Sequence, residues 1–325
     1  ATLFPYTTLF RSIGATMRLW TYSDSCNMKH EGCCAESAVE DARRVCDKLG
    51  IDFYVMNFKD MFKDKVVDYF VDEYIHGRTP NPCIACNKYL KFDALLKKAL
   101  AMGIDYVATG HYAKIEKGED GKYILRASEA VKKDQSYVLY NFTQEQLAHT
   151  LMPLGGYNKD WVRQKAEELG LGVAHKPDSQ EICFVEDDDY AKFITDYSGY
   201  KPKEGDILDV NGNVIGKHRG LIYYTIGQRK GIGAYGRPMF VMKIDAENNT
   251  ITLGEKGMEF SNELTAYDVN FVSGEFPKEN MLITAKVRYQ APPAAAMLCP
   301  QKDGTVKLMF PDRKSTRLNS SHESP

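Results

Sequence analysis

Three cysteines lie in polar surroundings where a thiolate could carry out chemistry. Cys83 and Cys86 form a CxxC pair in the stretch PNPCIACNK, and Cys183 lies in the stretch DSQEICF. Two prolines stiffen the approach to the pair, and a helix beginning at Cys86 would present its N-terminal amides. Together with Lys88, these amides favour the thiolate over the thiol. The residue types indicate nucleophilic sulfur chemistry, thiol–disulfide exchange or metal binding.

The eight cysteines leave more than one interpretation open. A single CxxC is typical of half a zinc site or of a thiol-redox motif, but a zinc site needs a second pair and the sequence holds no second CxxC. Cys183 alone would be interpreted as core filling. Cys46 and Cys299 are interpreted as small apolar side chains without a chemical role, because they fall in patterns expected for a helix and a strand.

The elements that must position these thiols alternate between strands and helices. Apolar residues recur at helical spacing between the short apolar runs, and glycines follow the helices as C-caps. This alternation predicts right-handed crossovers and a parallel sheet that binds ligands at the carboxyl ends of its strands. The expected order is a strand over 13–20, a helix ending at Gly50, a strand over 52–58, a helix ending at Gly77, a helix over about 86–102 closed by Gly103, and a strand over 105–110.

The expected secondary structure changes beyond the middle of the chain, from helices to strands. Helices are expected from Thr143, where Gln146 completes a capping box, and around residues 161–169. Hairpins are expected in DILDVNGNVIG and FVMKIDAENNTITLG, so the C-terminal third is β-rich. The predicted organisation is a foreign, adapter-like segment over 1–12, a nucleotide-binding α/β domain over 13–198, β-rich domains over 199–260 and 261–312, and a second foreign segment over 313–325.

Composition narrows the class of protein. The chain has 325 residues, with 42 lysines and arginines against 44 acidic residues, for a net charge of -2. Nucleic-acid contacts must therefore come from local patches. No stretch approaches the roughly 18 apolar residues of a membrane span, and no secretion leader opens the sequence. We expect a soluble, cytoplasmic protein without membrane contacts.

Six motifs occur in a fixed order between residues 13 and 312: NPxxxCNK, TGHY, KDQSY, DSQxICF, YYTIGQRKG and KVRY. In combination they resemble the tRNA-specific 2-thiouridylase family. The resemblance implies an α/β fold: a Rossmann-like adenine nucleotide alpha hydrolase (PP-loop) domain, followed by two small β-rich domains, the last a truncated β-barrel. It also implies a sulfurtransferase that exchanges oxygen for sulfur at C2 of the wobble uridine of tRNA.

The resemblance also implies roles for individual residues. Cys86 resembles the catalytic nucleophile, and Cys183 the cysteine that carries sulfur as a persulfide. The implied contacts with the target base are Asn81, Pro82 and Cys83; those with ATP are Met17 and Gly110; those with tRNA are His111, Lys133, Asp134, Gln135, Arg288 and Tyr289.

The implied reaction uses ATP with Mg2+ to adenylate the C2 oxygen, because oxide is otherwise too poor a leaving group. A sulfur-donating protein, either a cysteine desulfurase or a relay, would load Cys183. Attack by Cys86 would release sulfide and leave a Cys86–Cys183 disulfide for a reductant to reopen. The target base must leave its stack to be reached.

Three departures from the family pattern change what is expected. Many members have aspartate where Cys83 stands, so Cys83, Cys86 and Cys183 could instead hold a [4Fe-4S] cluster that binds sulfide. The family's SGGxDS loop is absent from the sequence, which predicts weak ATP binding and little turnover. Beyond Asp312 the family's last strands are missing, which predicts an open barrel edge.

Two other classes of function stay open at this point. A thiol–disulfide oxidoreductase using Cys83 and Cys86 would work without ATP or RNA. An inactive remnant would bind tRNA without modifying it. The basic run Lys217–Arg219 and the segment Gly227–Gly231 are either solvated turns or a surface that tracks phosphates.

Overall fold

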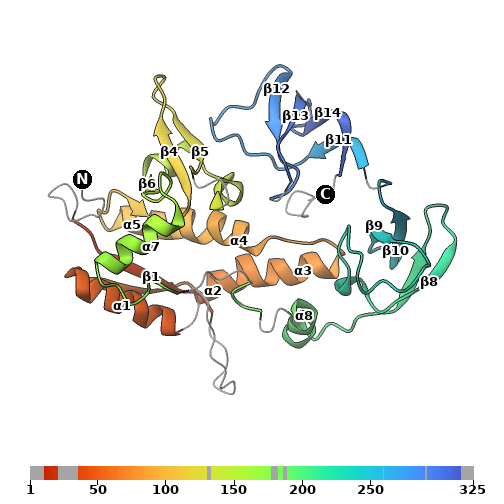
Figure 1. The fold of residues 1–325 in the computed structure, drawn as a ribbon, viewed down its shortest axis with the longest axis horizontal. Coiled ribbons are helices and arrows are strands. Elements are labelled where there is room, and N and C mark those ends of the chain that lie inside the picture. Colours follow the sequence, from red (N-terminus) through yellow and green to blue (C-terminus); the bar gives the residue numbers. More distant parts are fainter. Residues whose placement is uncertain are drawn as a thin grey trace. The chain divides into compact units, whose positions relative to one another are not determined.

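The computed structural model describes residues 11–20, 36–129, 133–176, 182–185, 189–258, 260–289 and 291–315 (Figure 1). Two compact units make up the chain. The first consists of Ala1–Val67, Cys83–Asp188 and Val272–Gly274, and the second of Asp68–Pro82, Asp189–Phe271 and Glu275–Pro325. The predicted domain boundaries after residues 198 and 260 stay predictions.

The first unit begins with a strand–helix–strand arrangement, as predicted. Strand β1 (Gly14–Arg18) pairs in parallel with β2 (Phe53–Asn57), and helix α1 (Glu36–Leu49) lies between them in sequence. Gly50 ends the helix with φ +67°, a conformation that glycine adopts without strain. A Cβ on Gly14 would lie 2.2 Å from Cys46 Sγ, so α1 packs closely on β1.

The second predicted helix is confirmed but is not α-helical throughout. It consists of α2 (Lys59–Phe62), a π-helical segment η1 (Lys63–Asp68) and α3 (Tyr69–Ile75). Its apolar residues are largely buried, with Phe62 and Phe70 fully so.

The helix that carries the CxxC pair starts earlier than predicted. It consists of α4 (Pro82–Ala85), a π-helical segment η2 (Cys86–Ala94) and α5 (Leu95–Ala101). Pro82 supplies a first helical residue that needs no N–H partner, so the helix starts there and not at Cys86. The expected start at Cys86 was therefore wrong by about one turn.

Beyond the CxxC helix, a second parallel pair joins β3 (Val107–Ala108) to β6 (Thr150–Leu151). In the described part of the first unit, the parallel strands thus form two separate pairs and not one continuous sheet. An antiparallel hairpin that the pattern analysis did not anticipate, β4 (Ala113–Lys117) with β5 (Tyr123–Ala127), follows β3 directly. Buried and exposed residues do not alternate regularly along these two strands, so the sequence lacks the two-residue periodicity that predicts a strand.

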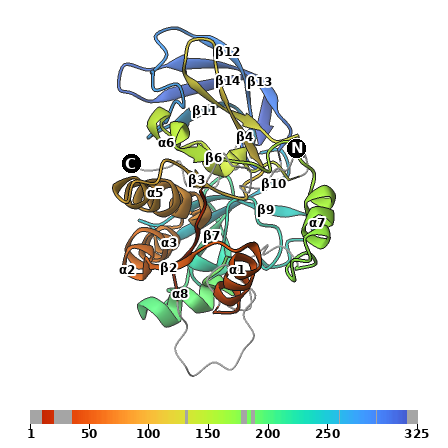
Figure 2. The same cartoon turned by 90° about the vertical axis from the view of Figure 1, so that its left-hand side faces the viewer.

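The two predicted later helices of this unit are confirmed. Helix α6 (Gln144–Ala148) has the expected capping box, in which Thr143 and Gln146 bond each other's backbone. Helix α7 (Lys159–Glu168) is capped by Asn158, whose Oδ1 accepts the N–H of Trp161 at 2.8 Å. Figure 2 shows α7 and α1 as separate helices of the first unit. A core of mostly apolar side chains lies under the hairpin: Phe92, Ala113, Leu139, Phe142, Leu147 and Met152.

The second unit is β-rich, as predicted. After helix α8 (Tyr190–Ser198), a four-stranded sheet has the order β8-β7-β10-β9. Both predicted hairpins are present, and β7 pairs with β10 in parallel. The strands are β7 (Gly205–Leu208), β8 (Val214–His218), β9 (Met239–Asp245) and β10 (Thr250–Glu255).

A separate antiparallel sheet follows, with β11 and β12 at its two edges in the order β11-β14-β13-β12. Strand β14 runs past Asp312 to Ser315, where it still pairs with Phe260 of β11. The strands are β11 (Phe260–Ala266), β12 (Met281–Ala285), β13 (Ala294–Pro300) and β14 (Val306–Ser315). The predicted α/β fold followed by β-rich parts is confirmed.

Candidate functional site

The CxxC pair spans one helical turn and differs in exposure. Cys83 lies in the first turn and is exposed, whereas Cys86 lies one turn further on and is 8% exposed. The unsatisfied amides of a helix belong to its first turn. The N-terminal amides that were expected to favour the Cys86 thiolate therefore lie in the helical turn of Cys83 instead.

Asn87, for which the sequence predicted no role, ties the Cys86 helix to its surroundings. Its side chain is 3% exposed, and its Nδ2 donates to the carbonyl oxygen of Val138 at 3.0 Å. Val138 lies in the 3-10 segment η4 (Ser136–Leu139) that follows the predicted tRNA-contact run. The Oδ1 atom of Asn87 is buried without a hydrogen-bond partner in the described structure. The only indication in the sequence was that Asn87 follows the cysteine of the NPxxxCNK motif.

Cys183 occupies a tight turn, closed by a bond from Val185 N to Ile182 O at 3.0 Å. Its neighbour Phe184 is fully buried, with its ring 5.7 Å from that of Phe62 and 6.4 Å from that of Trp20. Trp20 follows strand β1, so the turn is held next to the carboxyl end of that strand. The rest of the DSQEICF stretch before Ile182 lies outside the described residues.

Helix α2 connects the two cysteine segments. Phe62, at its C-terminal end, contacts Phe184, and α2 also packs against η2, which begins at Cys86. The chain leading to Cys183 is tied to α1 by an ion pair of Lys176 with Asp41 at 2.8 Å. Both predicted thiol segments thus pack on one helix of the first unit.

The two predicted ATP-pocket residues lie on the two parallel pairs. Met17 pairs with Met56 across β1 and β2 and is partly buried. Gly110 is exposed just past β3, and a Cβ added to it would meet Leu154 at only an ordinary 3.7 Å. Internal packing therefore does not require glycine at position 110, which leaves its exposed backbone accessible to a ligand.

His111 is a neutral side chain in this structure. Burial lowers its pKa from 6.5 to about 4, and the positive charge of Lys91 adds to the effect. Its Nδ1 lies 2.8 Å from Thr109 Oγ1, and its ring lies 5.6 Å from that of Phe92. At neutral pH it offers hydrogen bonds rather than a positive charge.

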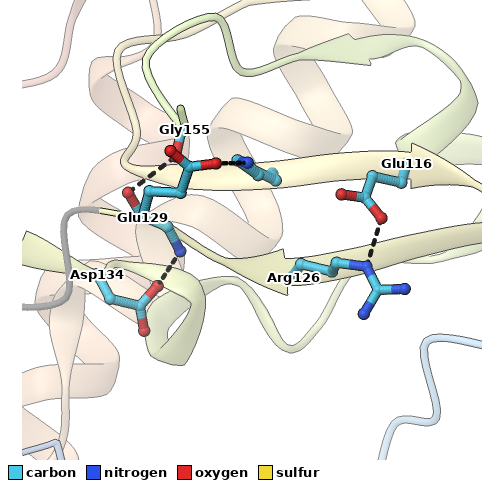
Figure 3. A network of polar contacts seen from close by, with 7 residues as sticks. Glu116, Arg126, Glu129, Asp134 and Gly155 are labelled. Carbon is cyan, nitrogen blue, oxygen red and sulfur yellow. Dashed lines mark hydrogen bonds and ion pairs between the residues drawn. The ribbon is translucent and has the colours of Figure 1, made fainter. Parts of the chain in front are cut away.

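Asp134 and Gln135 make internal hydrogen bonds. The Asp134 carboxylate accepts the backbone N–H of Ser128 at 3.0 Å, and Figure 3 shows one contact of this carboxylate. It also accepts the backbone N–H of Ser136 at 3.3 Å and the Ser136 hydroxyl at 2.7 Å. Gln135 accepts the N–H of Tyr112 on its Oε1, and its own N–H donates to Tyr112 O, both at 2.9 Å. These contacts fix the Lys133–Gln135 run against the segment that carries His111.

Gly155 closes the same region. The Ser128 hydroxyl and the N–H of Glu129 both donate to its carbonyl oxygen at 3.1 Å (Figure 3). A Cβ at this position would lie 2.0 Å from the backbone oxygen of Ala113. Only glycine fits there, because the backbones of two segments approach closely.

Asn81 and Pro82 belong to the second unit, at the end of a turn locked by a buried ion pair. Glu73 is 6% exposed, and Arg78 donates to its two carboxylate oxygens at 2.9 and 2.5 Å. This bidentate geometry is the strong form of such a pair and keeps the pKa of Arg78 above its ordinary value, mainly through the hydrogen bond to Glu73. The lock orients the chain that enters α4.

The remaining predicted tRNA contacts, Arg288 and Tyr289, lie in the turn after β12 and not in a strand. Tyr289 is 43% exposed, and the Lys286 ammonium lies 5.6 Å from its ring centre. Of the basic runs, His218 is 1% exposed and bonded to Asn249 O at 3.0 Å, and Lys217 pairs with Asp206. The run at 217–219 is therefore not one continuous basic surface.

Two further properties concern metals and membranes. No three histidine, cysteine, aspartate or glutamate side chains among the described residues gather closely enough to hold a metal ion. None of the helices in the described ranges is long and apolar enough to cross a bilayer.

Comparison with known proteins defines the class. The family model for the tRNA methyl transferase HUP domain matches residues 6–187, and that for the tRNA methyl transferase PRC-barrel domain matches residues 191–255. The chain therefore has a Rossmann-like HUP domain followed by a PRC-barrel domain. These matches agree with the parallel strand pairs and with the β8-β7-β10-β9 sheet.

Relatives specify the family. Proteins named tRNA-specific 2-thiouridylase MnmA from Acetivibrio thermocellus and Clostridioides difficile are each 55% identical to the chain, over 93% and 92% of its length and 85% and 83% of theirs. The one from Clostridium beijerinckii is 53% identical over 93% of this chain and 84% of its own length. The chain belongs to the tRNA-specific 2-thiouridylase family.

Proposed function

We propose that this chain catalyses the ATP-dependent 2-thiolation of the wobble uridine of tRNA. The substrate and the type of reaction are inferred from family membership. The observation in the structure that supports the chemistry is the packing of both cysteine segments on helix α2, through Phe184 and through η2.

The proposed reaction has two connected parts. ATP adenylates the C2 oxygen of uracil and releases pyrophosphate, which converts that oxygen into a leaving group. A sulfur-donating protein leaves a persulfide on Cys183. The Cys86 thiolate attacks the Cys183 sulfur of the persulfide, releases hydrosulfide and forms a Cys86–Cys183 disulfide. Hydrosulfide displaces AMP from C2, and a thiol reductant returns both cysteines to the reduced state.

Several side chains are assigned proposed roles by position. Gly110, exposed at the carboxyl end of β3, is proposed to border the nucleotide, as is Met17 on β1. Asn81, Pro82 and Cys83 are proposed to contact the target base at the start of the CxxC helix. Arg288 and Tyr289 are proposed to contact tRNA, since an arginine beside an exposed aromatic ring suits base stacking.

His111 contributes as a neutral hydrogen-bonding group, consistent with its lowered pKa. Asp134 and Gln135 are proposed to act on tRNA indirectly, by holding Lys133 and the Gly110–Tyr112 segment in place. A [4Fe-4S] cluster held by Cys83, Cys86 and Cys183 would be the alternative carrier of sulfide.

The test is thiolation of unmodified tRNA by the purified chain with ATP, Mg2+ and a persulfide donor, analysed by mass spectrometry of the wobble nucleoside. We expect a low yield of 2-thiouridine, because the absent SGGxDS motif predicts little turnover. The product should require ATP and both cysteines, so Cys86→Ser and Cys183→Ser abolish it while Cys46→Ser does not. ATP titration in the same assay measures the affinity that the missing SGGxDS motif predicts to be weak.

Two outcomes would replace this proposal. Reduction of small disulfides without ATP or RNA, lost in Cys83→Ser, would establish the oxidoreductase alternative. Binding of tRNA without product at any ATP concentration would establish the inactive remnant.

A further inference from the structure

Helix α7 has two differently used faces. Lys159 and Arg163 are one turn apart and lie on one face. Two residues beyond Arg163, and so on the other side of the helix, the Lys165 ammonium pairs with Glu168 at 2.5 Å and lies 5.8 Å from the ring centre of Trp161. Lys165 is thus engaged within its own helix, whereas the Lys159–Arg163 face contributes basic groups to the surrounding segments.

The Arg163 guanidinium is partly buried, and its Nε atom is buried without a hydrogen-bond acceptor among the described residues. A buried N–H of a charged group is costly to leave unsatisfied. Guanidinium presents several donors in a planar fork that matches the oxygens of a phosphate group. An acceptor supplied by a ligand would satisfy this atom.

Lys133 and Tyr112 belong to the same locality. The two 2.9 Å hydrogen bonds between Gln135 and Tyr112 hold the segment after Lys133 against Tyr112. Burial raises the pKa of the Tyr112 hydroxyl, and the charges of Lys133 and Arg163 oppose that rise. Both cations therefore lie close enough to Tyr112 to act on its hydroxyl.

The same two cations act on Lys159. Burial, then Arg163 and then Lys133 lower the pKa of Lys159 below its ordinary value. Lys133 of the 133–136 segment and Arg163 of α7 thus lie near both Tyr112 and Lys159. Cations brought together in this way bind a multiply negative group favourably.

We propose that Lys133, Lys159, Arg163 and the Tyr112 hydroxyl bind a phosphate of the tRNA backbone. This inference rests on the proposed function and extends it with a binding site on α7. The chain's net charge of -2 provides no global attraction for RNA, so a local group of cations is needed. Such a contact positions the RNA without reading its sequence.

The experiment compares Arg163→Ala and Lys159→Ala with Lys165→Ala, which removes the same charge from the other face of the same helix. Dissociation constants for unmodified tRNA are measured by fluorescence anisotropy across a series of KCl concentrations. We expect Arg163→Ala and Lys159→Ala to weaken binding about tenfold each and to reduce the slope of log K against log salt by about 1. Lys165→Ala should keep the wild-type slope.

The outcomes separate this inference from the function beneath it. If the wild-type chain binds no tRNA, the proposed function fails and this site fails with it. If wild type binds tRNA but the Arg163 and Lys159 variants match Lys165→Ala, the phosphate site is wrong and the proposed function stands. Weakened ATP or pyrophosphate binding with unchanged tRNA affinity would assign the cations to the nucleotide and overturn the proposal. Since Lys159 is partly exposed, its variant remains informative if Arg163→Ala does not fold.

Discussion

Two neighbouring parts of the first unit are held in place by different forces. In the thiol region, defined as Cys86, Cys183 and the rings of Trp20, Phe62 and Phe184, apolar packing positions the chain. In the polar edge, defined as residues 109–112 together with 133–136, nearly every restraint is a hydrogen bond. Asn87 follows Cys86 and donates to Val138, two residues beyond the polar edge, so it connects the Cys86 helix to the segment that continues from that edge.

The difference agrees with the roles proposed for the two regions. Under the proposed function, packed rings hold a sulfur-transferring thiol in place without polar groups that compete for it. Under the same proposal, the other region exposes polar groups to nucleotide and RNA, and hydrogen bonds orient those groups without burying them. We therefore expect the two regions to respond differently to substitution.

The largest effect is expected from Phe184→Ala, which removes a fully buried ring from the thiol region. Loss of its contacts with Phe62 and Trp20 should lower the free energy of unfolding by about 3–5 kcal/mol. Urea unfolding followed by tryptophan fluorescence measures this. Tyr54→Ala, at a position that is 48% exposed, is the control and should cost less than about 1 kcal/mol. Equal losses would show that ring packing does not hold the Cys183 turn.

Gly155→Ala tests the backbone contact beneath the polar edge. The added methyl group would meet Ala113 O, and relieving that clash should cost up to about 3 kcal/mol of unfolding free energy. Gly156→Ala is a matched control, because a Cβ there meets Lys114 at an ordinary 3.8 Å. Thermal melts of the two variants should separate clearly, and coincident melts would contradict the close approach.

Asp134→Ala removes an acceptor of three internal hydrogen bonds from the polar edge. Ser128 and Ser136 would lose their partner, which should cost about 2 kcal/mol. Asp134→Asn retains one acceptor oxygen and should cost less. A variant with wild-type unfolding but weakened tRNA binding would show that the carboxylate contacts RNA directly and would remove the contrast between the regions.

The smallest effect is expected from pH. The folded pKa of His111, about 4, lies below the unfolded value of about 6.5, so the unfolded chain binds the extra proton first. Stability should be constant above pH 6.5 on this account and fall by roughly 1–2 kcal/mol as pH drops toward 4. His111→Gln, which does not titrate, should lack that part of the loss. Identical pH profiles for the two proteins would rule out a buried neutral histidine.

Much of the fold could be predicted from local patterns. The helix with Val39, Ala42 and Val45 on one face, the capping box at Thr143 and Gln146, and both hairpins of the β7–β10 sheet follow from periodicity and turn chemistry. The start of the CxxC helix was misplaced, because Pro82 was interpreted as a rigid approach and not as a first helical residue. The β4–β5 hairpin was missed, since its burial pattern does not alternate cleanly.

By itself, the sequence determined which residue types could transfer sulfur, which family they resemble and where most helices and strands lie, because these depend on short-range spacing. Tertiary structure decided how those residues are used. Asp134 accepts hydrogen bonds from Ser128 and Ser136, and burial makes His111 neutral. Lys133 and Arg163, which are distant in sequence, both lie near Tyr112 and Lys159. Burial and long-range approach are properties of the folded chain, so no local pattern could have supplied them.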